Sequence, residues 1–267
     1  MSQRGVTAAQ ELAAVTQTII EGLSADQWAA DSACHGWRVQ DLVGHMGFFF
    51  NFIADPELVL PDNPSGTSER LNDAAVIERA DWSPAQVVDY YAEQAAAGLA
   101  VLAALQTAEL RDQPLEMLDL GTYAMAQLSD AVAFDHLVHL HSDLLAPHGA
   151  VASAAELPIT SSIDPALDWM IAGFAPMCGS AVGAVIEGPV GLRLTGATQR
   201  SFVIGTDADQ PDSVTVTESE DLPADVAVSD ALDFTRWGTR RSAWRSAVTV
   251  EGDRARVSRV LDAIDIV

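Results

Sequence analysis

The sequence of 267 residues contains no lysine: all 14 of its basic residues are arginines, against 38 aspartates and glutamates. Without a lysine amine the chain can form no lysine Schiff base, can anchor no pyridoxal phosphate and has no P-loop lysine for a nucleotide's phosphates. The net charge of -24 also opposes binding to nucleic-acid backbones and to anionic membrane surfaces. The composition therefore predicts a protein with neither a nucleic-acid partner nor a membrane partner.

Cysteines and long apolar runs are scarce as well. The two cysteines, Cys34 and Cys178, lie in different halves of the chain and make no disulfide framework, so we expect a reducing, cytoplasmic environment. No run approaches the ~18 uninterrupted apolar residues of a membrane span, and the first residues lack the apolar core of a signal peptide. With 49% hydrophobic residues the chain can still build substantial cores, and its length suits two domains.

The first 150 residues predict an antiparallel four-helix bundle. Thr7 followed by Gln10 has the spacing of a capping box that opens the first helix, and Ser83-Pro84 supplies an N-cap and a first-turn proline for the third. The region of residues 55–81, rich in proline, predicts a long loop. The expected helices span about residues 7–23, 39–53, 83–105 and 122–145.

The pattern changes after Ala150. A helix is expected over about residues 164–181, followed by short strand-like runs between turns, the first of them at Gly183 to Ile186. The alternation of Val214-Thr215-Val216-Thr217 is typical of a half-exposed strand. Residues 160–267 therefore predict an α+β domain with a mainly antiparallel sheet, after an all-helical domain of residues 1–150.

Three side chains predict a metal site within the helical domain. Asp135 and His139 are four residues apart, so a helix places them on the same face. His45 shares a helical face with Leu42 and Phe49, which would normally point into a core. A carboxylate and two imidazoles form a facial set of ligands that leaves coordination positions open, as in catalytic sites. We expect Zn²⁺ or a similar divalent ion at His45, Asp135 and His139.

Other interpretations of the histidines and of the first cysteine stay open. His136 is a rival donor for the ion. His45 taken alone is also typical of a core histidine that bonds to a backbone carbonyl, and Cys34 is typical of a buried apolar filler. His141 and His148 are expected at the surface near the end of their helix, where the helix dipole favours a cation.

A group of arginines stands out in so acidic a chain. Arg236, Arg240, Arg241 and Arg245 lie within ten positions, and we call these four residues the arginine cluster. It predicts a local positive surface that holds an anionic substrate or a cofactor carboxylate, with Arg240, Arg241 and Arg236 as the binding residues. The alternative is that these arginines only pair with acidic groups of the same chain.

The segment from Cys34 to His45, CHGWRVQDLVGH, resembles the Cys-x-Gly-Trp-x-Val-x-Asp-Leu-Val-x-His signature of the mycothiol-dependent maleylpyruvate isomerase family. Asp135 and His139 match the place where that family has an acidic residue four before a histidine. The C-terminal half resembles the sterol-carrier-like domain that often follows. The resemblance implies a DinB-like four-helix bundle that binds a divalent metal, and a cofactor that is mycothiol or a similar small thiol.

The chain departs from the family's pattern around this second motif. Asp135 stands where glutamate is usual, so its carboxylate reaches one methylene less far. Three residues, in place of the usual two, separate His139 from Asp143-Leu144.

Together these features predict a divalent-metal-dependent enzyme that activates a small thiol for addition to an electrophilic, anionic small molecule. The reaction would be an isomerisation, which regenerates the thiol, or an S-transfer. Two alternatives stay open: a metal-dependent hydrolase that activates water, and a non-catalytic metal- or ligand-binding protein. The sequence does not determine the oligomeric state, and a homodimer is one option.

Overall fold

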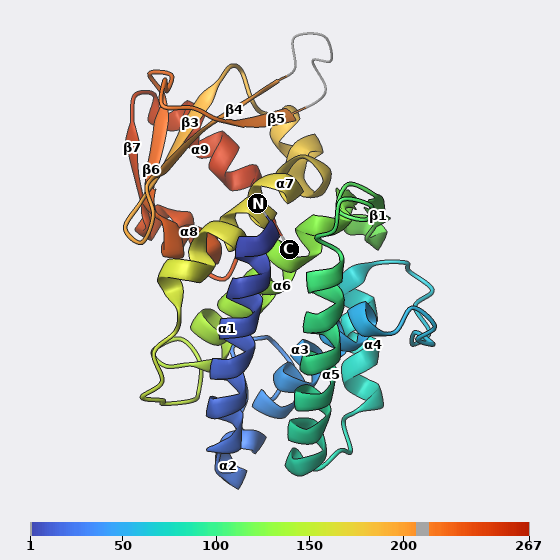
Figure 1. Cartoon of the computed structure of the whole chain (residues 1–267). Helices are drawn as coiled ribbons and strands as arrows, with labels where there is room; N and C mark the ends of the chain where they lie inside the picture. The colour runs from blue at the N-terminus through green and yellow to red at the C-terminus, as the bar shows by residue number, and fades with distance from the viewer. Residues whose placement is uncertain (1, 207–213, 267) are drawn as a thin grey trace. The chain divides into compact units, whose positions relative to one another are not determined.

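The structure, a computed structural model, describes residues 2–206 and 214–266. The chain divides into two compact units, Met1–Ala166 and Leu167–Val267, and the division falls within helix α7 (Ile159–Gly183). The first unit is helical, and the second contains a sheet (Figure 1). This confirms the predicted combination of a helical bundle with an α+β region.

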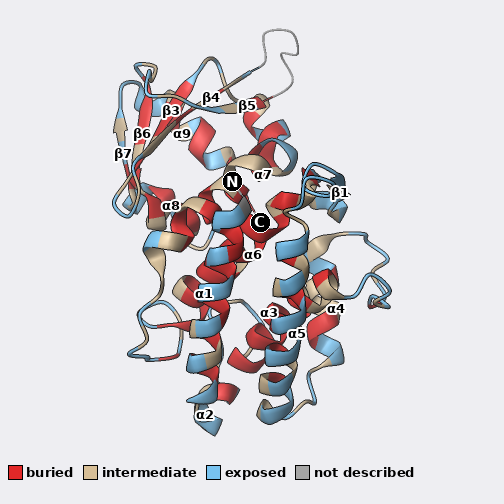
Figure 2. Cartoon of the chain, in the orientation of Figure 1, coloured by how far each residue is buried: buried red, intermediate tan, exposed pale blue. Residues whose placement is uncertain are grey.

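Four helices form the core of the first unit. Helix α1 packs against α5 and α6, and α3 packs against α5. Helices α3 and α6 bury most of their residues, whereas α5 buries a single stripe, and Figure 2 shows these buried residues on the bundle's helices. The helices span Ser2–Glu21 (α1), Val39–Ala54 (α3), Pro84–Ala104 (α5) and Leu128–Val138 (α6).

The start of α5 follows the sequence signal closely. Ser83 caps the helix by accepting a hydrogen bond from the backbone of Gln86, the Gln86 side chain caps the backbone of Ser83, and Pro84 occupies the first turn. The predicted cap at Thr7 is wrong. Helix α1 already begins at Ser2, and the Thr7 hydroxyl donates to the carbonyl of Gln3 one turn earlier, within the helix.

Several segments of the first unit differ from the prediction, and the first is a short helix, α2 (Ala25–Ala29), between the first two predicted helices. Helix α4 (Ser68–Glu78) lies in the region predicted as a loop; it buries only Leu71, Ala75 and Val76, too short a stripe to show as helical periodicity. The helix predicted from residue 122 begins only at Leu128. The residues before it form an antiparallel hairpin of β1 (Pro114–Glu116) and β2 (Thr122–Ala124), with 3₁₀ turns at Leu118–Leu120 and Met125–Gln127.

The second unit is an α+β structure in which α7 precedes a five-stranded sheet of order β5-β4-β3-β6-β7. The β3–β6 pair is parallel and the other pairs are antiparallel, which confirms a mainly antiparallel sheet. The strands are Val190–Thr195 (β3), Arg200–Thr206 (β4), Val214–Glu218 (β5), Val226–Asp230 (β6) and Val248–Glu251 (β7), with helices Ala231–Trp237 (α8) and Arg254–Ala263 (α9).

One predicted strand of the second unit does not form. The run from Gly183 to Ile186 lies at the end of α7 and in the turn that follows, because the amides of Val185 and Ile186 bond back to the carbonyl of Val182. Among the described residues, no helix combines the length and the apolar character needed to cross a bilayer.

The packing of α3 against α5 can be tested at two glycines. A Cβ at Gly98 of α5 would lie 2.7 Å from Cδ1 and 3.0 Å from the carbonyl oxygen of Phe50, whereas a Cβ at Gly44 of α3 would meet nothing within 4 Å. We expect Gly98→Ala to lower the free energy of unfolding by about 1–3 kcal/mol through overpacking. Gly44→Ala should preserve it or raise it by up to about 1 kcal/mol through helix propensity.

Urea denaturation of both variants beside the wild type measures these differences. The same helix-propensity gain applies to both substitutions, so their difference isolates the contact with Phe50. A Gly98→Ala variant as stable as Gly44→Ala would show that the two helices do not approach this closely.

Candidate functional site

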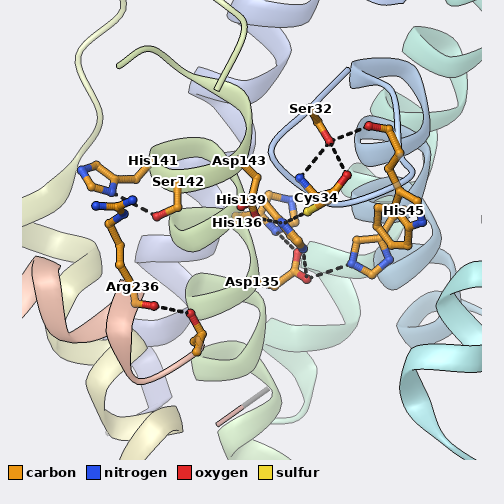
Figure 3. A network of polar contacts seen from close by, with 12 residues as sticks. Ser32, Cys34, His45, Asp135, His136, His139, His141, Ser142, Asp143 and Arg236 are labelled. Atoms are coloured by element: carbon orange, nitrogen blue, oxygen red, sulfur yellow. Dashed lines mark hydrogen bonds and ion pairs between the residues drawn. The ribbon is translucent and has the colours of Figure 1, made fainter. Parts of the chain in front are cut away.

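The three predicted metal ligands come from helices that are distant in sequence and meet inside the bundle. His45 lies on α3, Asp135 lies near the end of α6, and His139 begins the π-helical turn His139–Leu144 that continues α6. Their side chains point toward one another (Figure 3). His45 and His139 are buried, and the Asp135 side chain is 12% exposed.

One oxygen of Asp135 is the centre of this group. Asp135 Oδ1 lies 3.2 Å from His45 Nε2 and 3.5 Å from His139 Nε2. The two imidazole rings stand edge to face, with centroids 5.1 Å apart. A tetrahedral ion with metal–ligand bonds of about 2.0–2.1 Å holds its ligand atoms roughly 3.4 Å apart. The two nitrogen donors and the carboxylate oxygen therefore fit a divalent ion such as Zn²⁺ in chemistry and in spacing.

His136, the rival donor, lies beside the other oxygen of the Asp135 carboxylate. Its Nδ1 lies 3.2 Å from Asp135 Oδ2, although the two atoms are not aligned as a hydrogen bond, and its Nε2 lies 3.0 Å from the hydroxyl of Tyr91. The ring is fully buried. Among the described residues, the groups whose ligand atoms converge do not include His136. Its position therefore suits holding Asp135 in place better than joining the ligand set.

A second group of donors lies on the other side of the His139 ring. His139 Nδ1 is 2.8 Å from Asp143 Oδ2 and 3.8 Å from Cys34 Sγ, and these atoms also converge closely enough to hold an ion. Cys34 is half-buried, and its contact with His139 makes it more than the apolar filler expected from the sequence. No role for Asp143 is predicted from the sequence. Its distance of four residues after His139, matching that of Asp135 before it, was the available signal.

The charges of the central groups differ although all of them are buried. Burial lowers the pKa of His45 more than Asp135 raises it, which keeps the imidazole neutral near pH 7. Burial also acts against charge on His139, but Asp135, Asp143 and Cys34 outweigh it and raise the pKa of His139 well above its usual value. Burial alone would raise the pKa of Asp135; the positive His139 and the surrounding imidazoles instead hold it well below the usual range. Without a metal, Asp135 and His139 form an ion pair.

The remaining aromatic and histidine candidates surround the ligands or lie apart from them. The ring of Trp37 lies 5.1 Å from that of His45, and its Nε1 donates to Asp73 at 3.2 Å. His148 is exposed, as predicted, and its ring packs edge to face on that of His141, which is only partly exposed.

The arginine cluster belongs to the second unit, at the end of α8 and in the loop after it. Arg240 donates to the carbonyl of Asp262 at 2.9 Å, and Arg245 contacts the carboxylate of the same residue at 2.9 Å. Arg236 is half-buried on α8, and its backbone carbonyl accepts from the amide of Arg241. Two of the four side chains are thus already engaged with Asp262, in keeping with the pairing alternative for these two.

The ion pair predicts how His139 behaves in the metal-free protein. Because Asp135 supplies the charge that raises the pKa of His139, we expect His139 to stay protonated at pH 7 and Asp135→Asn to lower its pKa. The stability from this raised pKa is fully present below the unfolded value of about 6.5 and is lost as the pH rises through the folded pKa.

NMR titration of histidine-labelled, metal-free protein measures this pKa. Chemical unfolding at several pH values should show the stability gap between the wild type and Asp135→Asn narrowing at alkaline pH. An unchanged His139 pKa in the variant would contradict the ion pair.

Comparison with known proteins agrees with this fold. The family described as mycothiol maleylpyruvate isomerase N-terminal domain matches residues 9–142, half of the chain. Crystal structures of the mycothiol-dependent maleylpyruvate isomerase, and of a mutant of it with one histidine changed to alanine, each match with a TM-score of 0.53 at 11% identity over 94% of this chain and 92% of theirs. That likeness shows a shared fold. No curated protein matches the sequence. The chain therefore belongs to the mycothiol maleylpyruvate isomerase N-terminal domain family.

Proposed function

We propose that the protein is a divalent-metal-dependent enzyme that activates a low-molecular-weight thiol, mycothiol or a similar molecule, for addition to an electrophilic small molecule. Its reaction is an isomerisation or an S-transfer. The observation that carries the proposal is the meeting of His45, Asp135 and His139 around one carboxylate oxygen inside the bundle. Membership of the isomerase family supports the choice of a thiol as the activated group.

The residues supply a particular electrostatic setting. As direct ligands, two neutral imidazoles and one carboxylate would cancel one of the two charges of a divalent cation, and the carboxylate of Asp143 beyond His139 would offset part of the other, so the ion would keep some positive charge toward an open position. A bound ion of this kind lowers the pKa of a coordinated thiol or water, because it stabilises the deprotonated form. His45 is ready for this role as a neutral donor, whereas His139 must release its proton. Metal binding should therefore strengthen as the pH rises.

Burial of the ligands adds to this effect. His45 and His139 are 6% and 8% exposed, and Trp37 packs on the ring of His45. Charges interact more strongly where water is largely excluded, so the ion's influence on a bound thiol is greater here than on an exposed surface.

The first test is metal content followed by thiol binding. We expect close to one divalent ion per chain, and loss of it in His139→Ala, because two protein ligands rarely retain a labile ion against buffer. Asp135→Asn keeps the shape but removes the charge and should weaken binding. Asp135→Glu restores the residue usual in the family and should retain it. Elemental analysis measures the metal content of each variant, and chelator competition measures its metal affinity.

Thiol addition separates the candidate reactions. With Co²⁺ in the site, a bound thiol should add a sulfur-to-metal charge-transfer band that is absent in His139→Ala. Turnover of an electrophile only in the presence of thiol supports the proposal, and recovery of the thiol distinguishes isomerisation from S-transfer. Turnover without thiol indicates a hydrolase, and metal content unchanged in His139→Ala overturns the ligand assignment.

We further propose that Arg240, Arg241 and Arg236 hold the anionic group of the substrate or cofactor. A bidentate Arg–carboxylate contact contributes about 1.5–3 kcal/mol. An incoming carboxylate has to compete with the carbonyl of Asp262, which accepts from Arg240 at 2.9 Å, and with the carboxylate of Asp265, 3.7 Å from Arg240 Nε. Arg240 is exposed, so an incoming carboxylate can reach it and exchange with these partners.

Maleate, a small dicarboxylate, is a suitable probe. Because about 1.4 kcal/mol corresponds to one decade of affinity, we expect Arg240→Ala and Arg241→Ala each to weaken maleate binding roughly tenfold in calorimetry, with metal content unchanged. Arg259→Ala is the matched control, since Arg259 is an exposed arginine of the same unit that pairs with Glu187 at 2.7 Å. Equal affinity in all three variants would remove the arginine cluster from the proposal.

A further inference from the structure

A carboxylate lies on each side of the His139 ring, and the contact with Asp143 is shorter than the contact with Asp135. Its Nδ1 lies 2.8 Å from Asp143 Oδ2, whereas its Nε2 lies 3.5 Å from Asp135 Oδ1. Asp143 is only 2% exposed. A buried carboxylate needs a partner, and an imidazole N–H pointing at it supplies one. Figure 3 shows the His139 ring between this carboxylate and that of Asp135.

A break in helix geometry places Asp143 there. In an α-helix each residue advances about 100°, so a step of four residues overshoots a full turn by about 40° and two such steps overshoot by about 80°. Asp135, His139 and Asp143 are two such steps. In a regular helix the third side chain would rotate away from the first.

The π-helical turn corrects this drift. It spans His139–Leu144, and the amide of Leu145 bonds to the carbonyl of Leu140, five residues earlier. In a turn closed over five residues, each residue rotates less about the helix axis than in an α-helix. The rotation from His139 to Asp143 is therefore less than a full turn, which offsets the excess rotation from Asp135 to His139.

The turn is tied to the loop that carries Cys34. The amide of Ala33 donates to the carbonyl of Asp143 at 2.9 Å, and Gly149 packs so closely on Asp143 and Leu144 that a Cβ there would collide with their backbone. The carboxylate of Asp143 is therefore fixed by its backbone as well as by His139.

We propose that Asp143 is a positioning residue for the metal site: it accepts the Nδ1 proton of His139, and the π-helical turn exists at this point to deliver it. Fixing the proton on Nδ1 leaves the lone pair on Nε2, which faces Asp135 and His45. A carboxylate in this place orients a ligating imidazole and increases its basicity. The inference rests on the proposed metal-dependent function.

Cys34 is the competing partner of the same nitrogen. Its sulfur is 3.8 Å from Nδ1, 1.0 Å farther than the oxygen of Asp143. A cysteine sulfur at that distance cannot set the position of the proton against a carboxylate oxygen at 2.8 Å. Replacing Cys34 should therefore leave the metal site intact.

The test measures Zn²⁺ affinity by competition with a chromophoric chelator in the full chain. We expect Asp143→Asn to weaken Zn²⁺ binding about 10- to 100-fold, the usual effect of removing a carboxylate that supports a ligating histidine. Cys34→Ser should bind as the wild type does. Asp130→Asn is the matched control, because Asp130 is an equally buried carboxylate of α6, also 2% exposed, outside both groups of converging donors.

A spectroscopic measurement keeps the proposal testable if Asp143→Asn folds poorly. In the Zn²⁺-loaded wild type, long-range ¹H–¹⁵N spectra of labelled histidines should show His139 protonated on Nδ1, with zinc on Nε2. Zinc on Nδ1 would overturn the proposal without any variant.

The outcomes distinguish failure of the positioning role of Asp143 from failure of the proposed metal-dependent function. Wild-type affinity in Asp143→Asn overturns the positioning role and leaves the metal-dependent function standing. Loss of zinc in Asp143→Asn and Cys34→Ser, but not in His45→Ala, would place the ion among Cys34, His139 and Asp143 and overturn the role as well. A wild-type protein that binds no zinc or other divalent ion removes the proposed function, and this inference with it.

Discussion

A carboxylate buried inside a helical bundle must be paired with groups that stabilise its negative charge. The positions of the surrounding histidines follow from how Asp135 meets this requirement. An uncompensated buried carboxylate costs several kcal/mol, far more than the packing of one side chain can offset. Asp135 lies against three imidazoles, those of His45 and His139 at one oxygen and that of His136 at the other. Because His45 comes from α3 and the others from α6 and its continuation, neutralising this one group ties two helices together.

Burial and the contacts with Asp135 give His45 and His139 different charges. Burial keeps His45 neutral, and the proximity of two carboxylates keeps His139 charged when no metal is present. A divalent ion at the site would take over the role of the His139 proton as the cation that neutralises Asp135. Metal and proton would therefore compete for one carboxylate, so the buried site would have a paired charge both with and without the metal.

The sequence was informative wherever local chemistry decides the structure. Ser83-Pro84 located the start of α5 because capping is a local interaction, and the spacing of Asp135 and His139 placed them on one face because the helix between them is regular. Thr7 misled because a threonine within a helix can satisfy its hydroxyl on the preceding turn as well as cap a new one.

Other features depend on contacts between distant segments and carry no local signal. The pairing of His136 with Tyr91, which turns a rival ligand into a neighbour of Asp135, joins residues 45 positions apart. The π-helical turn is a change of hydrogen-bond register that no residue in His139–Leu144 demands by itself.

The shorter acid at position 135 and the histidine beside it have a joint consequence for coordination. Asp135 Oδ2 lies against His136, whose other nitrogen is engaged with Tyr91, so Oδ1 alone faces His45 and His139. A metal ion among these residues would meet the carboxylate through one oxygen and have three protein ligands in all. Four-coordinate ions with three protein ligands keep a position for an exchangeable ligand. On the proposed function, the crowding that holds Asp135 by one oxygen would thus leave room for a thiol on the ion.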